Sequence, residues 1–302
     1  EEDKFQKIVC AYLAEYAVKY FGEEQLESNS FTYRLKTILD NVMYLMKHIM
    51  EELSQSEFFV ADCELKIGED IPSYTIVLPG HKIAVCGSVD RVDIMQRADI
   101  TYLRIIDYKT GTKQFKLSDI LYGINLQMLL YLHSIEASGG DKYGEIVPAG
   151  ILYMPATVPY ISSDSLKSID KLPDELNKKL KMNGLLLKDT EIIHGMDKTD
   201  VATYIPVKIK AGEPVSSTSL ATLAEFGKIF KKVDMLIAEM GKNIYNGNIE
   251  AKPLKGGHDS CEYCPYDSVC AYRQSNPITC FSVDNKTVIE EITNEINGKE
   301  EE

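Results

Sequence analysis

The chain has 302 residues, a formal net charge of −13, 44% hydrophobic residues and 26% charged residues, a composition typical of a globular protein with one large or two smaller domains. No apolar run approaches the roughly 18 residues that a membrane-spanning helix needs, so we expect no membrane partner. The net charge argues against non-specific phosphate binding over the whole surface. The sequence begins at Glu1 with no basic and apolar leader, so we expect no signal peptide and a fragment of a longer protein.

The spacing of apolar residues predicts the secondary structure in chain order. Helices are expected at 4–20 and 31–54, followed by strands at 58–67, 74–78, 82–95 and 102–108. A long helix is expected from Ser118, a suitable N-cap residue, to Ser138, where Gly139 and Gly140 stop it. A buried strand at 150–154 and a helix at 219–245 complete the pattern. The expected fold class is therefore α/β, with a mixed sheet flanked by helices.

The same reading divides the chain into five parts. They are a helical N-terminal part at 1–56, a core sheet and helix at 57–156, an insertion at 157–217, a helix at 218–250, and a Cys-rich segment with an acidic tail at 251–302. The insertion contains four prolines and is expected to be an irregular surface segment with some helix and without recognisable chemistry.

The motifs GSVDRVD and IIDYK place aspartates on two neighbouring predicted strands. If a hairpin turns near 98–99, Asp90 lies almost opposite Asp107, and both share a face with Lys109, whereas Asp93 points away. Two carboxylates and a lysine on an apolar strand pair are unfavourable unless a partner such as Mg²⁺ compensates them. Lys109 is then placed to orient the attacking water or to stabilise charge on a phosphate. The alternative is a structural Asp–Lys ion pair at the rim of the sheet.

Gln127 and Tyr131 form a second candidate pair on the following helix. They are four residues apart, so they share one face and can reach back toward the two carboxylates. The alternative is a tyrosine of the core with a satisfied hydroxyl beside an incidental glutamine.

The seven cysteines are an odd number in a chain without a secretory signal, so a metal or cluster site is expected rather than a disulfide framework. Cys261, Cys264 and Cys270 lie within ten residues, a spacing that suits a metal site. Judged by the number of ligands alone, the three cysteines could bind zinc with His258 or Cys280 as the fourth ligand. The alternative is free thiols on a loop.

In order, these motifs resemble the RecB branch of the PD-(D/E)XK nucleases. With GSVDRVD, YLRIIDYKTG, LYGINLQMLLYL, KLKMNGLLLKD and CEYCPYDSVC, the resemblance extends from about residue 31 to 272 and is closest to the nuclease domains of bacterial AddAB-type helicase–nucleases. It implies a restriction-endonuclease-like core, preceded by helices and followed by a Cys-rich cluster segment.

The resemblance also implies roles for individual residues. Asp90, Asp107 and the Tyr108 carbonyl are expected to hold Mg²⁺ or Mn²⁺, with Lys109 as the catalytic lysine, while Gln127 and Tyr131 assist with DNA or with the site. The family's upstream metal-ligating histidine has no clear counterpart. His48 lies on a suitable helix, but a lone histidine on a helix is usually structural.

The resemblance further implies that Cys261, Cys264 and Cys270 hold a [4Fe–4S] cluster together with a cysteine far upstream. Cys10 is the only N-terminal candidate here, but a cysteine within an amphipathic helix is more often a buried structural residue. The family's own fourth ligand is expected upstream of this chain, which would leave the cluster incomplete.

The expected function is metal-dependent exonuclease cleavage of single-stranded DNA during double-strand break repair and homologous recombination in the bacterial cytoplasm. The expected partners are single-stranded DNA and the A subunit of the helicase–nuclease. The sequence contains no G-x4-G-K-[ST] loop, so ATP use belongs to other parts of the complex. The alternatives are a catalytically inactive DNA-channel module with an iron–sulfur or zinc site, and a stand-alone Cas4-like exonuclease.

Overall fold

A computed structural model describes residues 2–22, 28–111, 113–159, 172–216, 218–270 and 277–300. The chain begins with α1 (Glu2–Phe21) and α3 (Asn29–Ser54), continues with β1 (Phe59–Ile67), β2 (Tyr74–Leu78), β3 (His81–Val85), β4 (Gly87–Arg97) and β5 (Ile100–Lys109), and then forms the 3₁₀ helix η1 (Leu117–Tyr122), α4 (Gln127–Ser138), α5 (Gly140–Tyr143) and β6 (Glu145–Pro155). The second half contains α6 (Leu172–Leu180), β7 (Asn183–Leu187), α7 (Thr190–Met196), β8 (Lys208–Lys210), β9 (Glu213–Val215), β10 (Leu220–Ala221), α8 (Leu223–Tyr245), β11 (Leu254–Gly256), α9 (Asp267–Cys270), β12 (Ile278–Cys280) and α10 (Asn285–Glu300).

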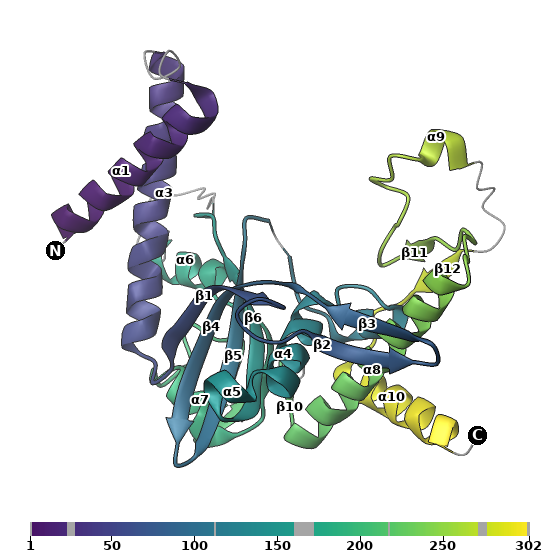
Figure 1. Ribbon diagram of the computed structural model, residues 1–302. Helices are drawn as coiled ribbons and strands as arrows, with labels where there is room; N and C mark the ends of the chain where they lie inside the picture. The colour runs from purple at the N-terminus through teal and green to yellow at the C-terminus, as the bar shows by residue number, and fades with distance from the viewer. Residues whose placement is uncertain are drawn as a thin grey trace.

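A mixed sheet forms the centre of the molecule, with the strand order β1-β4-β5-β6-β7-β10. The β1/β4, β4/β5 and β6/β7 pairs are antiparallel, whereas β5/β6 and β7/β10 are parallel. The segment that contains η1, α4 and α5 connects the parallel strands β5 and β6 (Figure 1). The α/β fold class predicted from the sequence is confirmed.

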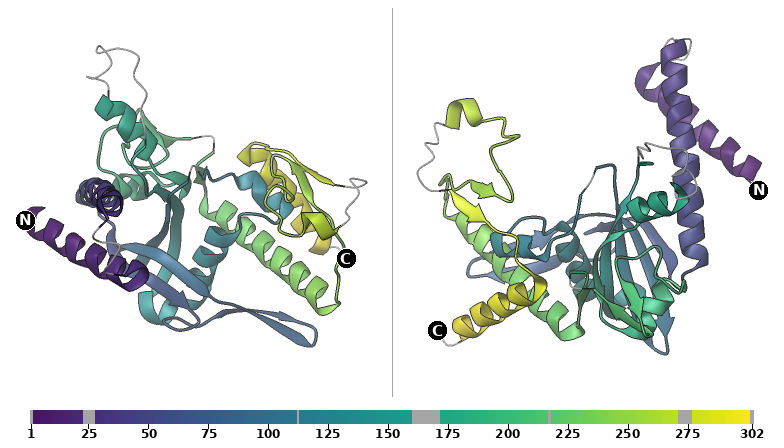
Figure 2. Two further views of the ribbon diagram at one scale, coloured as in Figure 1. Left: turned by 90° about the horizontal axis from the view of Figure 1, so that it is seen from above. Right: turned by 180° about the vertical axis from the view of Figure 1, so that it is seen from behind.

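Helices cover both faces of the sheet. On one face, Glu52 near the end of α3 bonds to Arg91, and Gly195 of α7 lies against Met95, which shares a face with Arg91. On the other face α4 packs on β5 and β6, and α8 packs outside α4 (Figure 2). Buried aliphatic residues such as Val92 and Leu152 fill the interior. Among the described helices, none has an apolar stretch long enough to cross a membrane.

The prediction of one long helix from Ser118 to Ser138 is wrong for residues 118–126. Ser118 lies inside η1 rather than at an N-cap, and α4 begins only at Gln127. Gly123 and Asn125 adopt left-handed backbone angles, with φ values of 68° and 54°, which an α-helix does not accommodate. The break separates η1 from α4 and turns the chain between them.

Three further segments differ from the prediction. The strand expected at 82–95 divides at Cys86, where β3 leaves to pair with β2 and β4 joins the main sheet. The stretch 157–217, expected to be a surface insertion, contributes β7 to the sheet, and its residues 160–171 lie outside the described part. The acidic tail contains α10, which packs against α8 and η1.

Four charged side chains join α3 to the sheet in a network that we call the buried charge cluster. Arg91 donates to both carboxylate oxygens of Asp93 at 2.7 Å and to Glu52 at 3.0 Å. Arg104 donates to Glu52 at 2.6 Å and to Asp93 at 3.0 Å. All four residues are at most 2% exposed, so their two positive and two negative charges compensate each other inside the protein.

His133 of α4 anchors the β2–β3 hairpin and α8 to the core. Its Nε2 lies 3.2 Å from the Tyr74 hydroxyl and 3.2 Å from Asp234, its Nδ1 lies 3.4 Å from Glu136, and its ring stacks on Phe230. Burial disfavours the charged imidazole, but the bonds to the two carboxylates outweigh it and raise the pKa of His133 to about 9.

We therefore expect alkaline pH to weaken the fold through His133. A folded-state pKa above the ordinary 6.5 stabilises the protein fully below pH 6.5 and progressively less as the pH rises toward about 9. The loss should be about 2 kcal/mol, since the carboxylate partners are partly exposed. Urea unfolding of the wild type and of His133→Gln between pH 6.5 and about 9 measures this loss as a change in the free energy of unfolding. The His81→Gln control should follow the wild type, and an identical pH dependence in His133→Gln would contradict the prediction.

Candidate active site

The β4–β5 hairpin brings two aspartates together at one end of the sheet. Its register pairs Arg91 with Ile106, so the next pair along the strands is Asp90 with Asp107, as predicted. One oxygen of Asp90 accepts a hydrogen bond from the backbone N–H of Tyr108 at 2.9 Å. The antiparallel pairing therefore places both carboxylates at the position where β5 ends.

Lys109 completes the predicted trio and lies beside two residues that the sequence analysis missed. Its ammonium forms an ion pair with Asp107, and it lies 5.7 Å from the ring centre of Tyr153. The ammonium of Lys113 lies 5.1 Å from the same ring. Burial, and then the charges of Asp107 and Asp119, raise the pKa of Tyr153 to about 12, so its hydroxyl stays protonated at neutral pH.

The next two strands of the sheet extend this arrangement. Tyr153 of β6 pairs with Asp107 on one side and with Asn183 of β7 on the other. The Asn183 side chain accepts the N–H of Phe115 at 2.7 Å and donates to the carbonyl of Lys113 at 3.1 Å. Asn183, which lies in the stretch expected to be an insertion, therefore holds the loop that carries Lys113 against the site.

Gln127 and Tyr131 lie together on α4, as their spacing predicts, with Gln127 Nε2 3.4 Å from the Tyr131 hydroxyl. That hydroxyl packs against Gly87, where a Cβ atom would collide with it, so a larger residue at this position would have to displace the Tyr131 ring. Gly87 lies three residues before Asp90 on β4. Within the described part of the chain, neither side chain forms a hydrogen bond or ion pair with the aspartates or Lys109.

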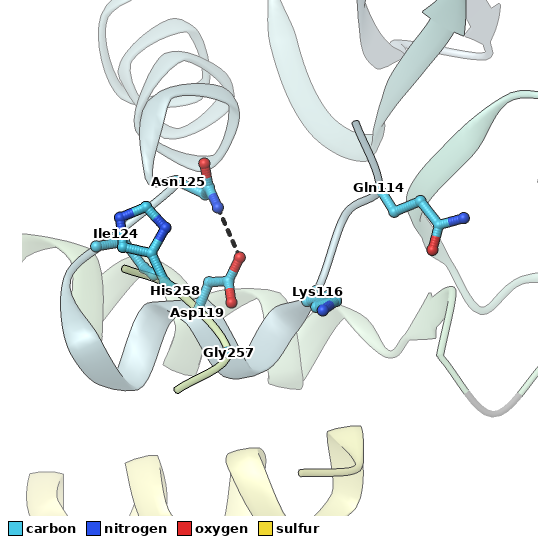
Figure 3. A pocket seen from close by; sticks show the side chains of 7 residues that line it. All are labelled: Gln114, Lys116, Asp119, Ile124, Asn125, Gly257 and His258. Carbon is cyan, nitrogen blue, oxygen red and sulfur yellow. Dashed lines mark hydrogen bonds between the residues drawn. The ribbon is translucent and has the colours of Figure 1, made fainter. Parts of the chain in front are cut away.

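A pocket of about 270 Å³ lies beside the loop after β5, between η1 and the start of the Cys-rich segment. Asn125 donates to the Asp119 carboxylate at 2.7 Å, and Figure 3 shows His258 next to this pair. Gln114 lies on the far side of the pocket, and Lys116 lies between the two groups. The Cys-rich segment thus packs close to the loop that approaches the active site.

The cysteines are not gathered into a metal site in this structure. Cys261 and Cys264 are partly exposed, Cys270 is exposed, and Cys280 is buried on β12. Cys10 belongs to α1, which lies at the opposite end of the molecule from α9 (Figure 1). Among the residues that the structure describes, no three His, Cys, Asp or Glu side chains are placed to hold a metal ion.

His48, the other candidate ligand, is a buried residue of α3. Its ring lies 5.4 Å from that of Tyr204, and burial lowers its pKa. These contacts are typical of a structural histidine.

The carboxylate pair, in contrast, fits a divalent cation. Oδ2 of Asp107 is buried and accepts no hydrogen bond from the described residues, and Lys109 is its only ionic partner there. Carboxylate oxygens are the preferred ligands of Mg²⁺, which needs only one or two of them besides water and phosphate oxygens. Asp90 and Asp107 would hold such an ion. No third acidic or histidine side chain joins them among the described residues. The Tyr108 carbonyl, which the family resemblance implies as a further ligand, stays a prediction.

The mixed sheet, its flanking helices and the D…D-x-K arrangement define the class of metal-dependent nucleases with a restriction-endonuclease-like core. The chain matches the sequence model of the PD-(D/E)XK nuclease superfamily over residues 4–271, and it belongs to that superfamily. The resemblance, the fold class and the assignment as a nuclease enzyme are thereby confirmed.

Curated relatives share much of the chain. It is 38% identical over 246 residues to the B subunit of the ATP-dependent helicase/deoxyribonuclease of Thermoanaerobacter sp. (strain X514), and the match covers 79% of this chain and 21% of that protein. Proteins of the same name from Alkaliphilus oremlandii and Clostridium kluyveri are both 36% identical, over 87% and 90% of the chain and 24% of each relative. The chain thus spans less than a quarter of the length of these relatives.

Proposed function

We propose that this chain is the metal-dependent deoxyribonuclease domain of the B subunit of a helicase–nuclease. It hydrolyses phosphodiester bonds, as an exonuclease, in single strands that a motor produces during double-strand break repair and homologous recombination. The observation that carries this proposal is the placement of Asp90, Asp107 and Lys109 together at the end of the β4–β5 hairpin.

Each residue of the site has a role in this proposal. A divalent cation on Asp90 and Asp107 supplies electrophilic stabilisation of the phosphate when it is bound. Lys109, held by Asp107, orients the attacking water or stabilises the negative charge that grows on the phosphate. Lys113 adds a second positive charge close to the ring of Tyr153. Water adds to phosphorus, and the bond from phosphorus to the departing sugar oxygen breaks.

Gln127 and Tyr131 are proposed to position the strand rather than to react with it. They lie on α4 beside Gly87, which precedes Asp90 by three residues along β4. A tyrosine hydroxyl and a glutamine amide are suitable partners for phosphate or sugar oxygens.

The protein partner, the location and the iron–sulfur cluster are proposed from the resemblance to the AddAB-type helicase–nucleases. The A subunit of the same complex is the expected protein partner, and the bacterial cytoplasm is the expected location. The names of the relatives support a helicase–nuclease over a stand-alone Cas4-like exonuclease. A [4Fe–4S] cluster on Cys261, Cys264 and Cys270 stays a prediction, and no catalytic step depends on it.

Metal removal tests the proposal directly. We expect the chain to degrade end-labelled single-stranded DNA with Mg²⁺ or Mn²⁺, to lose this activity in excess EDTA, and to regain it when excess Mg²⁺ is added back, because the carboxylates need a cation beside the phosphate. Gel analysis of both 5′- and 3′-labelled strands measures the rate and the polarity. Cleavage that persists in EDTA would exclude this chemistry, and the absence of cleavage with either metal would favour the inactive DNA-channel alternative.

A further inference from the structure

A larger pocket, of about 590 Å³, lies between the end of α6, the segment before β7 and the β8–β9 hairpin. Nine of the described residues line it, and four of these are lysines and none is acidic. The four are Lys178, Lys181, Lys208 and Lys210, and we refer to it as the lysine pocket. Such a concentration of positive charge contrasts with the net charge of −13 of the whole chain.

One of the four lysines is fixed by the backbone, whereas the other three are exposed to solvent. The ammonium of Lys181 donates to the carbonyls of Ala202 at 2.6 Å and Val207 at 3.0 Å. Lys178, Lys208 and Lys210 are exposed, and among the described residues none of the three forms an ion pair or a side-chain hydrogen bond. These three ammonium groups are available to an anion.

The β8–β9 hairpin presents two of these lysines together. Lys208 and Lys210 are two residues apart on β8, so both side chains leave the same face of the strand. Glu213, which pairs with Lys210 across the hairpin, accepts a hydrogen bond from the Thr190 hydroxyl at 2.9 Å. One oxygen of this carboxylate is thus directed to Thr190, and among the described residues it forms no ion pair with Lys210.

The lysine pocket opens at the end of the sheet that carries the active site. Asp107, Tyr153 and Asn183 are successive partners on β5, β6 and β7. With neighbouring strands about 4.8 Å apart, the backbone of Asn183 lies about 10 Å from that of Asp107. Lys181 precedes Asn183 by two residues, and α6 lies at this same end (Figure 1). A strand bound at the aspartates can therefore reach the pocket.

We propose that the lysine pocket binds the phosphate backbone of the DNA strand whose scissile phosphodiester lies at Asp90 and Asp107. This inference rests on the proposed function and adds the path that the strand follows outside the catalytic centre. The roughly 10 Å between the backbones of Asp107 and Asn183 corresponds to about three phosphates of a stacked strand, which lie about 3.4 Å apart. Because none of the described residues that line the pocket is aromatic and could stack on a base, its contacts are with phosphates and are independent of sequence.

The salt dependence of DNA binding tests this proposal. Fluorescein-labelled oligo(dT) of about twenty nucleotides, longer than the path to the pocket requires, is titrated with the 302-residue chain in EDTA at several salt concentrations, and fluorescence anisotropy reports binding. Each phosphate contact on a single strand contributes a slope of about −0.7 in log K against log salt. The variant with Lys178→Gln, Lys208→Gln and Lys210→Gln should bind about tenfold or more weakly at low salt, with a slope less steep by about 2.

A matched variant separates this effect from the change in total charge. Lys4→Gln, Lys7→Gln and Lys36→Gln remove three exposed lysines of α1 and α3 that do not line the pocket, and should leave the slope and the affinity at the wild-type values. Wild-type slope and affinity in the pocket variant overturn the proposal. A parallel titration with labelled polyglutamate tests an acidic protein segment as the ligand. If the pocket variant loses polyglutamate binding but retains DNA binding, the proposal is overturned and the pocket is assigned to an acidic protein segment.

A small substrate distinguishes failure of this proposal from failure of the proposed function. Thymidine 5′-p-nitrophenyl phosphate occupies the catalytic centre without extending to the lysine pocket. The pocket variant should hydrolyse it at the wild-type rate while it degrades long strands more slowly. If no form of the chain hydrolyses it, the proposed nuclease chemistry fails, and the anisotropy slopes alone decide whether the pocket binds DNA.

Discussion

Replacing Asp107 by Asn is expected to lower Mg²⁺-dependent cleavage of single-stranded DNA by about 10³-fold. The change removes a negative charge from the proposed cation site and leaves the ammonium of Lys109 without its ionic partner. The amide has nearly the same shape as the carboxylate, and Oδ2 of Asp107 accepts no hydrogen bond from the described residues, so the fold should tolerate the change. Initial rates on an end-labelled strand, measured at saturating Mg²⁺, give the effect.

Asp99→Asn provides the matched control for this experiment. Asp99 lies exposed in the turn of the same hairpin, at the end of β5 opposite to Asp107, so the same chemical change should leave the rate unaltered. The thermal midpoint of each variant shows whether the fold is intact. A folded Asp107→Asn variant that cleaves within tenfold of the wild-type rate would exclude Asp107 from the metal site.

The second large effect concerns stability. Glu52→Gln is expected to lower the free energy of unfolding by about 3–5 kcal/mol, the usual consequence of breaking a buried ion pair. Glu52 compensates Arg91 and Arg104 at once, and with it gone two buried guanidinium groups share only Asp93. Equilibrium unfolding in urea measures the loss as a lower midpoint at unchanged slope.

Glu51→Gln is the control for this variant, since it makes the same change one residue earlier on an exposed position of α3. It should stay within about 0.5 kcal/mol of the wild type. A Glu52→Gln variant as stable as Glu51→Gln would show that the buried charge cluster contributes little to the stability of the fold.

The proximity of Asp90, Asp107 and Lys109 could be predicted from the sequence because its geometry is local. Asp90 and Asp107 lie on consecutive strands joined by a short turn, and the alternation of strand residues fixes which side chains share a face. The same reasoning correctly placed Asp93 on the opposite face, where it joins the buried charge cluster. Helical spacing brought Gln127 and Tyr131 together in the same way.

Residues that reach the site through distant strand pairing could not be predicted in this way. Tyr153 meets Asp107 only because β6 pairs in parallel with β5, after a long connection that contains α4. Asn183 lies near the site because β7 pairs with β6. The residues around Asn183 in the sequence therefore do not indicate that its side chain holds the loop of Lys113. Long-range register is set by the packing of the whole sheet.

Two other predictions were wrong although the sequence contained features that indicate the observed structure. Gly123 and Asn125 are residue types that adopt left-handed angles readily, and together they mark the break before α4. In the acidic tail, Val288, Ile292 and Ile296 recur every four residues and are buried in the core, a helical pattern that the surrounding glutamates obscured.

The packing of α10 on α8 gives the Cys-rich segment two fixed ends. The segment leaves the end of α8 and returns to α10, whose apolar residues belong to the core, while α9 projects away from the sheet (Figure 1). A loop held at both ends loses less chain entropy on becoming ordered than a free tail does. Ordering this segment around its thiols would therefore cost less chain entropy than ordering a free tail of the same length.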